Sequence, residues 1–168
     1  MLRWLAETIS NRAPEAGTAL VRVVRGHLEG DEEAARIVAA IAGLLGTVAY
    51  ADRHYAPAEE ERIRAELGRV QGLTEAGVDA ICTVLREHIV QISTIEAPVY
   101  ARELLALGDR GLRLEVLDAL VDLAAADGDI SVAETNMLRL TATALGLTQD
   151  EYNDCQARHR DKLSVLRG

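Results

Sequence analysis

The sequence predicts an all-α fold, a single-domain bundle of about seven to eight helices. Hydrophobic residues make up 49% of the 168 residues, with no Phe and one Trp, so the core must consist of Leu, Ala, Val and Ile. Ala and Leu are strong helix formers, and only three Pro interrupt the chain. Apolar residues recur at helical spacing, and no segment alternates as a strand does. A chain of this length can bury one sizeable core.

The first helices can be placed in order along the chain. Residues 1–29 are expected to form an N-terminal helical segment and residues 30–168 the main helical domain. Within the latter, a long helix is expected from Asp31 to about residue 51. It contains the uncharged run 37–51, which is too short for a bilayer span of about 20 residues and indicates a buried central helix. The next helix should begin at Pro57, which suits a first turn, and end at Gly72.

The remaining helices are expected over residues 74–93, 97–107, 109–126 and 131–145, with a last one that begins at Thr148. Pro98 opens the second of these and Gly108 ends it. The helix over 109–126 carries two apolar stripes, so it should be covered on most sides. Thr148 and Glu151 form a Thr-x-x-Glu capping box, which is typical of a helix N-terminus.

Part of the sequence repeats after 75 residues (127 − 52 = 75). Residues 44–67 align with residues 119–142, so that Asp52 matches Asp127 and Glu59 matches Glu134. Each unit consists of a buried helix, an acidic turn and a helix that starts with acidic residues. The repeat predicts two helical hairpins related by a pseudo-two-fold axis. It leaves open whether the two acidic turns lie close together.

The second turn, DGDISVAE at residues 127–134, has a sufficient structural explanation for most of its residues. Ser131 is a good N-cap, and Glu134 at the third helical position can complete a capping box. Gly128 suits the left-handed conformation that ends many helices.

Asp127 is harder to explain, because it closes the preceding helix, where the helix dipole disfavours a negative charge by a few tenths of a kcal/mol up to about 1. Asp52 occupies the equivalent place in the first turn. Each Asp either accepts hydrogen bonds from backbone amides of the next helix or meets a cation. Asp127, Asp129 and Glu134 could supply hard oxygen ligands. They do not form an EF-hand, since Val132 and Leu138 stand at its sixth and twelfth positions.

In the first turn, Arg53 and His54 replace Gly and Asp. This turn is therefore poorer for Ca²⁺ or Mg²⁺, and Asp52, His54 and Glu59 would favour Zn²⁺ or Mn²⁺. The alternative is an ordinary solvent-exposed histidine at His54.

The paired ADxxxxxxE turns at residues 51–59 and 126–134 resemble those of the tellurite-resistance TerB-like family. The stretch LRLTATALGLTQDEYNDCQARHRDKL (residues 138–163) resembles its stand-alone bacterial members, and residues 74–107 are similar in layout. The resemblance covers roughly residues 30–163. It implies an all-helical fold with pseudo-symmetric halves and a role in tellurite and chemical-stress responses, without enzyme activity. The divalent-cation ligands that it implies are Asp52, Glu59, Asp127, Asp129 and Glu134.

Two functions follow as hypotheses. In the first, the chain is a non-enzymatic cytoplasmic stress-response protein whose acidic turns bind Ca²⁺, Mg²⁺, Mn²⁺ or Zn²⁺. In the alternative, it is a helical protein–protein interaction module whose turns are purely structural helix caps. The sequence names no partner protein and no oligomeric state.

Other function classes are disfavoured. The net charge of −9 opposes nucleic-acid binding, which depends on Lys and Arg contacts to phosphate. The sequence has no Glu-x-x-His pair, HExxH motif or phosphate loop, so no enzyme activity is expected. Cys82 and Cys155 are expected to be free thiols in a reducing cytoplasm. Residues 2–9 are weakly amphipathic and are expected to dock on the bundle, so membrane association should be peripheral at most.

Overall fold

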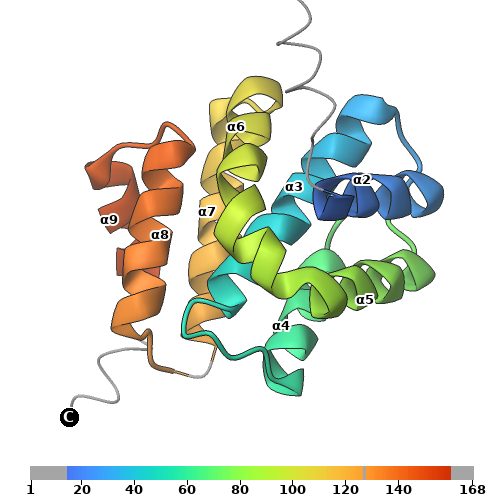
Figure 1. Ribbon diagram of the computed structural model, residues 1–168. Helices are drawn as coiled ribbons and strands as arrows, with labels where there is room; N and C mark the ends of the chain where they lie inside the picture. Colours follow the sequence, from blue (N-terminus) through green and yellow to red (C-terminus); the bar gives the residue numbers. More distant parts are fainter. Residues whose placement is uncertain (1–14, 127, 160–168) are drawn as a thin grey trace, which may run out of the picture.

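The computed structural model describes residues 15–126 and 128–159, and the regular elements of these residues are helices joined by short turns and loops (Figure 1). An isolated backbone bridge joins Leu28 to Leu73. The helices are α2 (Glu15–His27), α3 (Glu32–Ala49), α4 (Pro57–Leu67), α5 (Glu75–Gln91), α6 (Ala97–Leu107), α7 (Arg110–Ala125), α8 (Val132–Ala144) and α9 (Gln149–Arg158). The predicted all-α bundle is confirmed. The boundary predicted between residues 1–29 and 30–168 stays a prediction.

Helix α3 forms the centre of the bundle, as the uncharged run predicted. It contacts α2, α4, α5, α6, α7 and α8, and Leu44, Leu45 and Val48 on it are almost completely buried. Asp31 is its N-cap, because the carboxylate accepts the Ala34 N–H at 2.9 Å. Figure 1 shows α8 and α9 at one side of the bundle and α2 and α5 at the opposite side, with α3 between them.

Helix α4 ends earlier than the sequence predicted. It stops at Leu67, with Gly68 as its C-cap, rather than continuing to Gly72. Glycine has a low helix propensity, so Gly68 already ends the helix. Gly72 lies in the following loop with φ +86°, close to the backbone of Glu29, whose N–H donates to the Gly72 carbonyl at 3.2 Å. A left-handed position beside another backbone favours glycine.

A π-helical segment, Ile92–Glu96, joins α5 directly to α6. The sequence had predicted two separate helices here because of Pro98. Pro98 lies in the first turn of α6, where a missing N–H removes no helical hydrogen bond. Glu96 is only 1% exposed, and its carboxylate accepts the Tyr100 hydroxyl at 2.8 Å. The segment therefore holds a buried polar contact inside the bundle.

Helix α7 is covered on most sides, as its two apolar stripes predicted. The buried side chains on it include Val116, Leu117, Leu120, Val121 and Leu123. Helix α9 packs on α7 and begins with the predicted capping box. The Thr148 hydroxyl accepts the Glu151 N–H at 3.2 Å, and the Glu151 carboxylate accepts the Thr148 N–H at 2.7 Å. Cys82 and Cys155 are free and buried.

Candidate functional site

The first acidic turn connects α3 to α4 and uses its own side chains as backbone caps. The Asp52 carboxylate accepts the His54 N–H at 3.0 Å, which is an Asx-type turn. The Glu59 carboxylate accepts the N–H of Ala56, the N-cap residue of α4, at 2.9 Å. Arg53 has φ +67°, an uncommon conformation for a side chain larger than glycine.

The second acidic turn connects α7 to α8. Gly128 has φ +87°, so its predicted left-handed conformation is confirmed. The Ser131 hydroxyl accepts the Glu134 N–H at 3.1 Å, which confirms Ser131 as the N-cap of α8. Asp129 is exposed. Asp127, the residue that motivated the cation hypothesis, lies outside the described residues.

The two turns have equivalent backbones. Arg53 and Gly128 are the positive-φ residues of their turns, and Ala56 and Ser131 are the N-caps of the following helices. Both pairs are separated by the 75 residues of the sequence repeat. The local equivalence of the turns agrees with the repeat, and the pseudo-two-fold relation between whole hairpins stays a prediction.

The turns meet at one small cavity of about 50 Å³. Asp52 and Glu59 line it from the first turn and from α4, and Glu134 lines it from α8. Three of the five predicted ligands therefore share one space, and the question that the sequence left open is answered: the two acidic turns are neighbours. Asp129 is not among the lining residues.

Arg62 on α4 lines the same cavity and is not among the site residues predicted from the sequence. It follows Glu59 by three residues, so the two side chains share one face of the helix. That spacing could have indicated that a guanidinium stands beside the candidate ligands. Arg62 thus supplies a positive charge at a cavity with three carboxylates.

His54 lies apart from this cavity. Its side chain is 84% exposed, and its Nδ1 is 4.0 Å from the nearer carboxylate oxygen of Asp52. The same Nδ1 lies 3.1 Å from the Asp52 backbone oxygen. These distances agree with the alternative of a solvent-exposed histidine.

The described residues include no group of three or more His, Cys, Asp or Glu side chains spaced to hold a metal ion. The carboxylates at the cavity are the oxygen ligands that Ca²⁺, Mg²⁺ and Mn²⁺ prefer. The chemistry of these ligands therefore fits a hard cation. The Asp52 and Glu59 carboxylates, however, already cap backbone N–H groups, and the Arg62 side chain lines the same cavity.

The family model described as "Tellurite resistance protein TerB" matches residues 38–157. The chain belongs to the TerB family. The TerB match begins within α3 and ends within α9, so it includes both acidic turns and the cavity between them. Comparison with curated proteins and with solved structures gave no match. In the described part of this TerB-family chain, no helix has both the length and the apolar character that crossing a bilayer requires.

Proposed function

We propose that this TerB-family chain is a non-enzymatic protein that binds one divalent cation at the cavity between its two acidic turns. The supporting observation is that Asp52, Glu59 and Glu134 line a single cavity although they come from turns 75 residues apart. One shared site replaces the two separate sites that a repeated motif would suggest. Of the other two ligands predicted from the sequence, Asp129 does not line this cavity, and Asp127, outside the described residues, is kept as a candidate for the titration below.

A hard cation suits this donor set best. The cavity offers carboxylate oxygens from Asp52, Glu59 and Glu134, which favours Ca²⁺, Mg²⁺ or Mn²⁺ over Zn²⁺. Zn²⁺ sites in proteins usually include His or Cys ligands, and His54 does not line the cavity. The resident metal would supply positive charge that holds the two turns together.

Binding has to compete with contacts that already exist. Asp52 and Glu59 each accept a backbone N–H within their own turn, and Arg62 lines the cavity. A carboxylate has about four lone-pair positions, so a capping bond leaves oxygens for an ion. The Arg62 side chain has to move aside or share these oxygens.

A thermal-shift and calorimetric titration tests the proposal. Wild-type protein is titrated with Ca²⁺, Mg²⁺, Mn²⁺ and Zn²⁺ against a chelator, beside Asp127→Asn and Glu134→Gln. Cation at 100-fold excess over Kd should stabilise the wild type by about 2.7 kcal/mol. Both variants should lose this gain, whereas Glu87→Gln, which removes an exposed carboxylate of α5, should keep it.

A wild type that no cation stabilises would overturn the metal proposal. The alternative, an interaction module with purely structural turns, would then stand. The capping bonds of Asp52, Glu59 and Ser131 favour that alternative. A partner protein would have to be found by other means.

The physiological role that we propose is a cytoplasmic response to tellurite and related chemical stress. Membership of the TerB family supports it. Cells that lack the gene should be more sensitive to tellurite, and the wild-type gene should restore growth. If Asp127→Asn and Glu134→Gln restore growth equally well, the cation site has no part in this role.

A further inference from the structure

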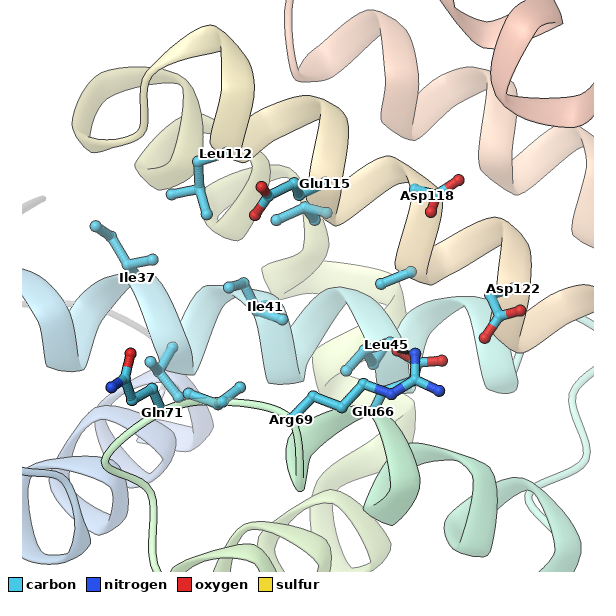
Figure 2. A pocket seen from close by; sticks show the side chains of 14 residues that line it. Ile37, Ile41, Leu45, Glu66, Arg69, Gln71, Leu112, Glu115, Asp118 and Asp122 are labelled. Atoms are coloured by element: carbon cyan, nitrogen blue, oxygen red, sulfur yellow. Dashed lines mark ion pairs between the residues drawn. The ribbon is translucent and has the colours of Figure 1, made fainter. Parts of the chain in front are cut away.

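A second cavity lies between α3, the C-terminal end of α4 with the residues that follow it, and α7. Its volume is about 590 Å³ and it shares no lining residue with the cavity between the turns. Ile37, Ile41 and Leu45 of α3 line it together with Leu112 and Val116 of α7. Figure 2 shows Ile37, Ile41 and Leu45 in a row along α3, with Leu112 of α7 across the space from them. We call this space the α3–α7 groove.

One end of the groove carries two facing carboxyl groups. Glu66 from α4 and Asp122 from α7 both line it, and burial together with the neighbouring Asp122 carboxyl raises the pKa of Glu66 to about 7. The Glu66 side chain is only 10% exposed, while Arg69, whose guanidinium is 3.6 Å from it, is 72% exposed. Figure 2 shows the Arg69 side chain extending towards Glu66. A carboxyl group whose pKa lies near 7 is partly protonated at neutral pH.

We propose that the α3–α7 groove binds a small amphipathic amine, with its apolar body along Ile41 and Val116 and its ammonium group at the Glu66–Asp122 carboxyl pair. The bound ammonium takes the place of the proton that Glu66 partly keeps. Both carboxylates can then be ionised and can accept its hydrogen bonds. Binding at neutral pH therefore releases part of a proton to solvent.

The size of the groove favours a small molecule over a protein segment. Ile37 and Leu45 are eight residues apart on one helix, which corresponds to about 12 Å. A volume of about 590 Å³ falls within the range of roughly 300–1,000 Å³ that small-molecule sites occupy. A stable protein partner would need about 1,000 Å² or more of interface.

The charges around the groove favour a cation over an anion. Glu115 and Asp118 line the groove in addition to Glu66 and Asp122, whereas Arg69 is the one basic residue among its described lining residues. Asp118 contacts the C-terminal end of α9, where its carboxylate is 3.4 Å from the Arg158 guanidinium and 3.5 Å from His159 Nε2. Of the four acidic residues that line the groove, Glu66 has the most strongly buried carboxyl group, at 10% exposure, and with Asp122 it forms the acidic end of the groove.

The test uses n-octylamine as the probe, with n-octanol and octanoate as ligands of equal chain length and different charge. We expect octylamine to bind the wild type, and octanol and octanoate to bind at least tenfold more weakly. Backbone amide NMR shifts should move at Ile41, Val116 and Asp122. No octylamine binding, or equal binding of octanol, overturns the proposal.

Variants separate the two ends of the groove. Asp122→Asn should weaken octylamine about tenfold, the size of one hydrogen bond to a charged group, while Asp154→Asn on the exposed face of α9 leaves it unchanged. Ala119→Leu, which adds bulk inside the groove, should weaken octylamine and octanol alike. Circular dichroism confirms that each variant is folded. If neither Asp122→Asn nor Ala119→Leu changes octylamine affinity, the amine binds elsewhere and the proposal fails.

The pH dependence of binding gives an independent readout. Glu66 faces Asp122 and Asp118 from α7 and Arg69 from its own helix end, and His159 at the end of α9 lies 3.9 Å from Asp122. Octylamine should bind several-fold more tightly at pH 8 than at pH 6, because Glu66 must lose its proton. Glu66→Gln should remove this dependence and His159→Gln should keep it. The opposite pattern would assign the dependence to His159 and would contradict the role of the carboxyl pair.

Discussion

The aromatic ring of Tyr100 lies directly on the backbone of Gly43, so that α6 and α3 approach each other closely. A Cβ atom at Gly43 would overlap the ring carbons Cδ2 and Cε2 of Tyr100. The ring cannot easily move away, because it is 4% exposed and its hydroxyl donates to the buried Glu96 carboxylate at 2.8 Å. Close packing in the centre of the bundle therefore depends on a glycine in the middle of a helix.

Gly43→Ala should destabilise the protein by about 1–3 kcal/mol, the usual cost of overpacking a core. This loss should appear although alanine gains roughly 1 kcal/mol of helix propensity over glycine. Urea denaturation followed by circular dichroism measures it. Gly26→Ala in α2 is the control, since a Cβ there meets nothing within 4 Å, and it should be neutral or stabilising. Equal effects at both sites would show that the ring of Tyr100 gives way.

Gly128→Ala should cost about 1 kcal/mol of stability, because φ +87° at this turn disfavours any residue with a Cβ. Arg53 has φ +67° at the equivalent position and already bears a Cβ, so Arg53→Ala should change stability by less than about 0.5 kcal/mol. The two alanine variants form a matched pair that thermal denaturation can compare. A similar loss at both positions would contradict an origin in backbone strain.

The fold could be predicted well from the sequence because helical periodicity and end signals are local. The uncharged run in α3, the N-cap at Asp31 and the capping box at Thr148 all appear where the sequence placed them. The end of α4 was wrong because two glycines competed for that role, and Gly68 comes first. The π-helical link before Pro98 was not predicted, and neither was the buried contact between Glu96 at its end and Tyr100, which only the packed structure reveals.

The candidate site was only partly predictable. Spacing indicated Asp52, Glu59 and Glu134, but their meeting at one cavity depends on how α4 and α8 pack around the ends of α3 and α7. The carboxyl pair of Glu66 and Asp122 gave no sequence signal at all. The two residues are far apart in the chain and belong to no motif, so only tertiary packing brings them together.

Glu66 should make the protein less stable as pH rises towards neutrality. Burial, followed by the neighbouring Asp122 carboxyl, raises the pKa of Glu66 from 4.5 to about 7. Between these values the folded state holds a proton that the unfolded state has lost, so the free energy of unfolding falls as pH increases. At about 1.4 kcal/mol per pKa unit, the loss from pH 4.5 to pH 8 is on the order of 3 kcal/mol.

Glu66→Gln tests this dependence, because glutamine keeps the size of the side chain and cannot ionise. Relative to wild type, the variant should gain stability between pH 5 and pH 8 in urea denaturation. Glu87→Gln on the exposed face of α5 is the control for the loss of a carboxylate. If wild type and Glu66→Gln differ by the same amount at every pH, Glu66 does not hold a proton in the folded state.

Arg62→Gln should tighten divalent-cation binding by about tenfold or more. The Arg62 guanidinium lines the cavity together with Asp52, Glu59 and Glu134, so its charge opposes an entering cation. Two unit charges about 4 Å apart near a protein surface interact by roughly 4 kcal/mol, which makes a tenfold change a conservative expectation.

Without cation the variant should be less stable than wild type, since the carboxylates then lack a positive charge at the cavity. Calorimetric titration with Ca²⁺ and Mn²⁺ measures the change in affinity, and thermal denaturation of the cation-free protein measures the change in stability, both beside Arg22→Gln, an exposed control on α2. Weaker binding in Arg62→Gln would mean that Arg62 positions the carboxylates for the cation and does not compete with it.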